Sequence, residues 1–339
     1  MLHLLNGDST ADILKQSVVQ GEMLPWREAL MAGPTPQNLS QDQWIEVRAK
    51  HLSEAYTLTF DDCKRDLSTL YAGLQSFSQH DEVVLWFEHD LFCQVNLIHV
   101  LDWFSKQKLG KTKLSLICIG EFPGRENFRG LGELTPAQLA SLFDQRHEVS
   151  DAERQLAAEA WAAYCSPNPQ PLAQFLEKEI SALPFLRAAL SKHLARFPSV
   201  RNGLGNIENK SLELIAGGAS EFREIFPKFG IAELIYGLGD AQFWNDLQPM
   251  IKAKHPLLTH TNMAEAKPAL ANAVQLKASF TFTETGRAVL NGESDFITLN
   301  EIDLWLGGVH LRPGNLWRCD EKNQKMIVVP TPRGSMLEN

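Results

Sequence analysis

The stretch Asp81–Cys93, DEVVLWFEHDLFC, decides the fold of the first part of the chain. Its apolar residues Val83–Phe87 run without a break, and a short, partly β-branched run of this kind is typical of a strand buried on both faces of a parallel sheet. Glu88, His89 and Asp90 follow at once. Open α/β sheets bind ligands at the carboxyl ends of their strands. The stretch therefore predicts a central strand and, at its end, a candidate site.

Two further apolar runs extend the predicted sheet. Leu2–Leu5 precedes the tripeptide NGD, and Leu114–Ile119 precedes the dipeptide GE. Helical patterns separate the runs, and this alternation predicts an α/β fold with a mostly parallel sheet flanked by helices. Gly21–Trp26 is a candidate edge strand, because Pro25 cannot donate to a central ladder.

Clustered proline, asparagine and glycine divide the chain into two predicted domains. Residues 1–200 form the α/β domain with a helical extension, and FPSVRNGLG at 197–205 marks the boundary. Residues 201–330 contain three short helical segments, a strand at Val274–Phe282 and a T-x-T-G-x-x-V-L motif from Thr283. This order is typical of a smaller α+β domain of the winged-helix type, and a generic α+β cap is the alternative.

Composition places the chain among ordinary globular proteins. Of its 339 residues, 44% are hydrophobic and 22% are charged, and no apolar run approaches the roughly 18 residues of a membrane span. The five cysteines show no C-x-x-C spacing, which favours a reducing cytoplasm over disulfides or a zinc site. We therefore expect a cytoplasmic protein without a membrane partner. The sequence does not set its oligomeric state.

The charge balance disfavours nucleic acid as a partner without excluding it. The net charge is −9, and residues 201–290 contain nine lysines or arginines against nine acidic residues. The segment in place of a recognition helix, DAQFWNDLQPMIKAK, contains two aspartates and Pro249. DNA-binding domains ordinarily present a basic face to the phosphates. A structural or protein-binding winged helix is the better prediction.

The strand ends supply the candidate site residues. His89, flanked by carboxylates, is the candidate general acid or base, with a pKa that we expect the neighbouring negative charge to raise. Asp8 is the second candidate catalytic residue, as its orienting carboxylate. The candidate ligand-binding residues are Asn6, Gly7, Ser9, Arg27, Glu88, Asp90 and Glu121. Because the ends of parallel strands lie side by side, we expect Asp8, His89 and Glu121 to cluster.

Structural alternatives to these roles stay open. Asp90 can cap the helix after the central strand, Ser9 or Asp8 can cap the first helix, and Arg27 can pair on the surface with Glu28. Cys93 is expected to be a small buried residue rather than a nucleophile. No recognised ligand spacing predicts a metal, and the cofactor is left open.

Longer motifs carry a resemblance to a known family. They are LHLLNGDSTADIL, GEMLPWREALMAGP and VVLWFEHDLFCQVNLIHVLDWF in the first half, and ENKSLELIAGG, GLGDAQFWNDLQ, FTETGRAVLNG and DLWLGGVHL in the second. Over nearly the whole chain they resemble the bacterial family catalogued as domain of unknown function 1835 with its C-terminal companion domain. Leu304 departs from the pattern, which has arginine before the tryptophan. The resemblance implies the organisation and leaves the activity open.

Two hypotheses about function remain. In the first, the strand-end residues bind a small anionic or nucleotide-like ligand, with hydrolysis or group transfer as an open extension. In the second, the protein is a non-catalytic regulator or adaptor that binds a protein or a nucleic acid through the winged-helix-like domain.

Overall fold

The computed structural model describes residues 1–261, 278–323 and 325–329. A five-stranded sheet, flanked by helices, has the order β2-β1-β3-β4-β5. Four strands are parallel, and β5 pairs antiparallel with β4. The strands are β1 (Leu2–Leu5), β2 (Glu22–Pro25), β3 (Glu82–Glu88), β4 (Lys113–Ile119) and β5 (His147–Glu148). The mixed α/β class, the central strand and the edge position of β2 are confirmed.

Alternating side chains of β3 supply both faces of the sheet. Val83, Leu85 and Phe87 join the cluster under α2 (Gln41–Ala55), α3 (Phe60–Gln75) and α4 (Leu91–Ser105). Val84 and Trp86 join a separate cluster under α1 (Asp8–Leu14) and α5 (Pro136–Ser141). The unbroken apolar run thus reflects burial on both sides of the strand.

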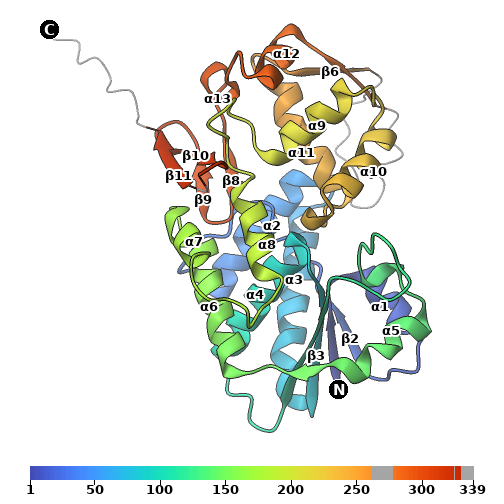
Figure 1. The fold of residues 1–339 in the computed structure, drawn as a ribbon. Coiled ribbons are helices and arrows are strands. Elements are labelled where there is room, and N and C mark those ends of the chain that lie inside the picture. Colours follow the sequence, from blue (N-terminus) through green and yellow to red (C-terminus); the bar gives the residue numbers. More distant parts are fainter. Residues whose placement is uncertain (262–277, 324, 330–339) are drawn as a thin grey trace, which may run out of the picture.

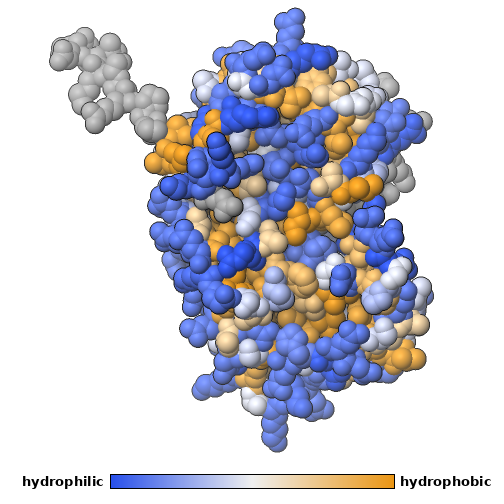
Figure 2. All heavy atoms as spheres, viewed as in Figure 1, coloured by the Kyte–Doolittle hydropathy of each residue, from blue (hydrophilic) through white to orange (hydrophobic). Residues whose placement is uncertain are grey.

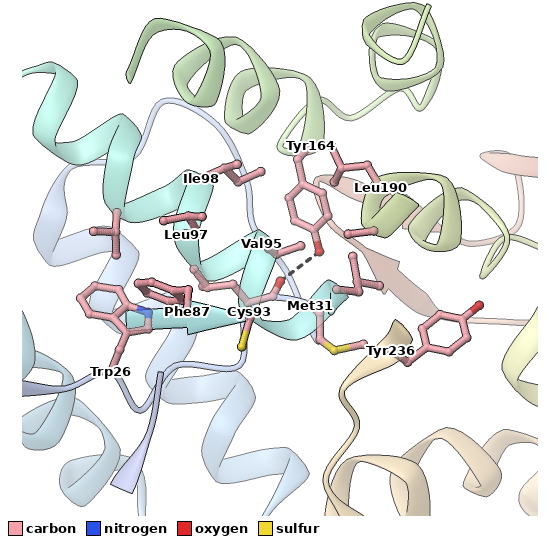
Figure 3. Packing of buried hydrophobic residues seen from close by; sticks show 14 of the residues in the cluster. Trp26, Met31, Phe87, Cys93, Val95, Leu97, Ile98, Tyr164, Leu190 and Tyr236 are labelled. Carbon is pink, nitrogen blue, oxygen red and sulfur yellow. Dashed lines mark hydrogen bonds between the residues drawn. The ribbon is translucent and has the colours of Figure 1, made fainter. Parts of the chain in front are cut away.

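The helix α4 is the centre of the larger apolar cluster. Figure 3 shows Val95, Leu97 and Ile98 of this helix beside Phe87, with residues from distant parts of the chain around them. Among these, the Tyr164 hydroxyl donates to the Leu30 carbonyl oxygen over 3.0 Å. Tyr236, far along the chain, belongs to the same cluster. One apolar core therefore joins the sheet region to the later helices.

Helices and short hairpins form the rest of the chain (Figure 1). The remaining helices are α6 (Asp151–Tyr164), α7 (Gln170–Phe175), α8 (Leu186–Leu194), α9 (Asn206–Ala216), α10 (Phe222–Ala232), α11 (Asp240–Lys252), α12 (Glu284–Asn291) and α13 (Phe296–Leu299). The hairpins pair β6 (Leu258–Thr261) with β7 (Ser279–Phe282), β8 (Leu304–Leu306) with β9 (Val309–Leu311), and β10 (Leu316–Asp320) with β11 (Lys325–Val329). Of the predicted strand Val274–Phe282, residues 274–277 lie outside the described residues, and the rest contains β7. Figure 2 shows hydrophilic residues over most of this face and hydrophobic ones gathered across its middle.

No helix in the described part of the chain combines the length and apolar character needed to cross a membrane.

Candidate functional site

The site lies at the carboxyl ends of β1 and β3. The chain runs from β1 to β2 on one side and then returns to place β3 on the other side of β1. Such a reversal of strand order opens a crevice, where doubly wound α/β proteins bind their ligands. In Figure 1 the chain begins at the opposite end of β1, so the strand ends face α10.

Glu88 ends β3 with a carboxyl group that is only 2% exposed and accepts several hydrogen bonds. Its Oε2 accepts from the side-chain nitrogen of Asn6 and, over 2.6 Å, from the thiol of Cys93. Its Oε1 accepts from the backbone N–H of Leu131 over 2.5 Å. Thr10 fixes the orientation of Asn6, because its hydroxyl donates to Asn6 Oδ1 over 2.8 Å. The carboxyl is therefore held from three segments of the chain.

Asp90 lies beside Glu88 and caps the next helix. Its Oδ1 accepts from the backbone N–H of Cys93 over 2.8 Å, at the N-terminus of α4. This confirms the capping role that the sequence left open. Burial and the nearby Asp90 raise the pKa of Glu88 to about 8. Burial raises the pKa of Asp90 to about 6.

Two glycines bring backbone against these carboxyls. A Cβ on Gly130 would lie 2.7 Å from Glu88 Oε1, and one on Gly237 would lie 2.3 Å from Asp90 Oδ1. Gly237 also has φ of +63°, which favours glycine. The two acids are therefore enclosed by chain segments that only glycine lets approach so closely.

A pocket of about 320 Å³ opens beside the two acids. Asn6, Glu88, Asp90 and Cys93 line it from the sheet side, and Arg129 lies on the loop after β4. The opposite wall comes from α10 and the following 3₁₀ helix, through Phe226, Pro227, Phe229, Gly230, Glu233, Leu234, Gly237 and Leu238. The pocket thus combines largely apolar walls with a few polar groups of shifted pKa, which is typical of ligand sites.

Asp8 and Arg27 pair with each other rather than at this pocket. The Arg27 guanidinium donates to the Asp8 carboxylate from Nε and Nη2, the shortest contact being 2.7 Å. Both side chains are more than half exposed. Helix α1 begins at Asp8 with Gly7 as N-cap, and Ser9 is exposed inside its first turn. The predicted cap by Ser9 or Asp8 is wrong, because Gly7 is the N-cap and both residues lie inside the first turn of the helix.

His89 and Glu121 also lie outside the lining of this pocket. The half-buried His89 ring packs against Phe185 with ring centroids 6.1 Å apart, while Glu121 is exposed. Burial lowers the pKa of His89, so the predicted increase is wrong: desolvation outweighs the hydrogen bond to the Ile119 backbone, which is what raises the pKa here. The contacts that Asp8, His89 and Glu121 make within the described residues do not bring them together. The catalytic roles of Asp8 and His89 and the ligand-binding role of Glu121 stay predictions.

The structure brings together a set of possible metal ligands that the spacing did not indicate. Ligand atoms of Glu88, Asp90 and Cys93 all lie within 4.8 Å of one another. Burial raises the pKa of the Cys93 thiol well above its usual value, and the thiol donates to Glu88. Any cation bound here would have to displace these protons.

A scan against protein-family models found no match to the chain, and a search among curated proteins found no similar sequence. The resemblance to the family of domain of unknown function 1835 stays a prediction.

Sequence reasoning missed the wall of the pocket formed by α10 and Gly237. Arg129 carries a local signal, since it follows the β4 strand end as a cation in a glycine-rich loop. The wall carries none, because its role arises only when the later helices pack against the strand ends.

Proposed function

We propose that the protein binds a small anionic ligand, of nucleotide-like or smaller size, in the pocket beside Glu88 and Asp90. The observation that carries this proposal is the pair of buried carboxyls, both with raised pKa, facing a pocket of about 320 Å³ at the point where the strand order reverses. Keeping such groups together costs folding free energy, and functional sites are where proteins retain them.

Glu88 gives the pocket its chemistry. With a pKa of about 8 it is mostly protonated at neutral pH, so it offers a proton to an oxygen or nitrogen of the ligand. A pKa near the working pH is what general acid–base catalysis requires. Hydrolysis or group transfer at this site is therefore a chemically reasonable extension of binding.

Arg129 gives the pocket its charge preference. It lines the pocket, and in the described part of the chain its guanidinium has no ion pair. Glu233, on the opposite wall, is paired with Lys192 at 2.5 Å. The unpaired cation favours a carboxylate or phosphate on the ligand.

The test is calorimetric titration with nucleotides and phosphorylated metabolites, using Arg129→Ala and the matched control Arg125→Ala. Arg125 lies on the same loop, is exposed and contacts Gln138. We expect Arg129→Ala to weaken binding about tenfold or more, the effect of losing roughly 1.4 kcal/mol, and Arg125→Ala to leave it unchanged. Equal losses from both variants, or no binding by any anion, would contradict the proposal.

A second candidate, a regulator with a winged-helix-like domain, is favoured by the order of elements after residue 205. Between α9 and α10, Phe222 donates from its backbone N–H to Ala278 over 3.0 Å, and Phe280 donates to Ser220 over 2.7 Å. Together with the isolated antiparallel bridge between Glu221 and Ser279, these bonds hold the start of α10 beside the β6–β7 hairpin, at the position of the first strand in a winged helix. Helix, strand, two helices and a hairpin are the order of a winged helix.

The contacts of α11 favour a protein or structural role over DNA binding. Asn245 of α11 donates to the Ala55 carbonyl oxygen over 3.1 Å, and Asp246 lines a pocket together with Tyr56 and Trp305. The helix in the recognition position is thus packed against the sheet region. We expect no mobility shift with random duplex DNA at physiological salt; tight, salt-dependent binding would contradict this.

A further inference from the structure

A second, larger cavity lies at the far end of α4 from the strand-end pocket. Its volume is about 410 Å³, and the two cavities share no lining residue. The loop 36–39 and the first turn of α2 cover one side, and α3 and the C-terminal halves of α4 and α6 form the others. Gln37 ties this loop to α6, because its side-chain nitrogen donates to the Ala162 carbonyl oxygen over 2.6 Å. The volume is that of a small-molecule site.

Aromatic rings line this cavity. Trp44 stacks on His99 with centroids 5.3 Å apart, and Trp161 meets His99 edge-on at 4.6 Å. Tyr71 and the half-buried Trp103 complete the set. Flat apolar walls of this kind bind flat apolar molecules, with ring–ring geometry adding to the buried area.

One hydrogen-bond chain fixes the protonation state of His99. The indole N–H of Trp44 donates to the Tyr71 hydroxyl oxygen over 2.7 Å, so the hydroxyl proton is free for its other neighbour, His99 Nε2, at 2.9 Å. Because burial lowers the pKa of His99 to about 3, the ring is neutral. A neutral ring that accepts at Nε2 carries its proton on Nδ1.

His99 lines the cavity, and its Nδ1 is buried without a hydrogen-bond partner among the described residues. Buried polar nitrogens are nearly always paired, so an unpaired one on a lining residue points to a partner supplied from outside, which for the Nδ1–H tautomer is an acceptor. The rim adds polar groups: Lys106 pairs with Asp102 at 2.6 Å, and Asn38 and Gln41 are exposed beside it.

We propose that this cavity is a second binding site, for a small planar heteroaromatic molecule with a hydrogen-bond acceptor. The ring lies among Trp44, Trp103 and Trp161, and the acceptor meets His99 Nδ1–H. A carboxylate or amide on the ring reaches Lys106 at the rim. An N-alkylated, cationic ring is disfavoured, because its ring nitrogen has no lone pair left to accept from His99 Nδ1–H.

The test uses three ring-matched probes: nicotinate, nicotinamide and 1-methylnicotinamide, which are anionic, neutral and cationic. Calorimetry and tryptophan fluorescence follow their binding to the full chain. We expect the first two to bind with a Kd of about 1 mM or tighter, as befits molecules of this size, and the cationic probe to bind at least about tenfold more weakly.

A variant that blocks the cavity tests whether the probes bind inside it. Ala162→Trp fills the rim from an exposed position on α6, and Ala152→Trp is the matched control, exposed on the same helix and away from the cavity. Ala162→Trp should weaken binding about tenfold or more, and Ala152→Trp and Arg129→Ala should leave it unchanged. Failure of all three probes to bind, preference for the cation, or binding that survives Ala162→Trp would each overturn the proposal.

Discussion

Two acid-containing clusters end neighbouring strands of the same sheet, yet their surroundings differ completely. At the end of β1, Asp8 pairs with Arg27 in solvent, with about half of each side chain exposed. At the end of β3, Glu88 is 2% exposed and shares its surroundings with Asp90. Solvent screens the charges of the first cluster, so its ionised carboxylate has little effect on the free energy of unfolding. Removal of water from the second makes a proton, rather than a cation, the partner of the carboxylate.

The largest expected effect is a dependence of stability on pH that comes from the buried cluster. Glu88 has a folded-state pKa of about 8 against an ordinary 4.5, so the folded state binds its proton more tightly than the unfolded state. The contribution of Glu88 to the free energy of unfolding is complete below about pH 4.5 and is lost as pH rises toward 8. Asp90 contributes in the same direction, and its contribution is lost as pH rises from 3.8 to about 6. From Glu88 alone the loss is on the order of 5 kcal/mol, because each pH unit between its two pKa values is worth about 1.4 kcal/mol.

Urea unfolding across pH 5 to 8 measures this effect, with Glu88→Gln and the exposed control Asp8→Asn. The wild-type free energy of unfolding should fall across the range, the slope should be much weaker in Glu88→Gln, and Asp8→Asn should keep the wild-type slope. If Glu88→Gln retains the full slope, the carboxyl at position 88 ionises normally and the contrast between the clusters fails.

The second expected effect tests how tightly the later helices enclose Asp90. Gly237→Ala and Gly110→Ala both place a Cβ at positive φ, +63° and +62°, but only at Gly237 would it meet an atom, 2.3 Å from Asp90 Oδ1. Gly110→Ala should cost about 1 kcal/mol from backbone strain alone. Gly237→Ala should cost about 1–2 kcal/mol more, because it also displaces the cap of α4. Equal losses in thermal unfolding would mean that Asp90 moves aside freely.

The sequence predicts the sheet well because its signals are local. The apolar run Val83–Phe87 and Pro25 of β2 each determine structure within a few residues. The backbone also approaches another segment closely at the β8–β9 hairpin, where the Gly308 N–H donates to the Tyr164 carbonyl oxygen over 3.0 Å. A pair of glycines in a hairpin signals that another segment can approach the backbone closely. The sequence does not show which residue that segment contributes.

The candidate site could be predicted only in part, for a geometric reason. Side chains alternate along a strand, so Glu88 and Asp90 take one direction and His89 another. The sequence shows that alternation but not which direction meets the pocket, since the wall from Phe226 to Leu238 is placed by packing across more than a hundred residues. The pKa of His89 depends on the same burial, and this is why its predicted direction was wrong.

The smallest expected effect on stability comes from a substitution in the exposed cluster of Asp8 and Arg27. Asp8→Ala removes the two-pronged pairing with Arg27, but both partners already face water and lose little when separated. We expect a change of about 0.5 kcal/mol or less in the free energy of unfolding, and less still at high salt. Ligand affinity at the pocket beside Glu88 should be unchanged, because Asp8 does not line it. A loss of affinity in Asp8→Ala without a loss of stability would instead restore Asp8 to the functional role expected from its place after the first strand.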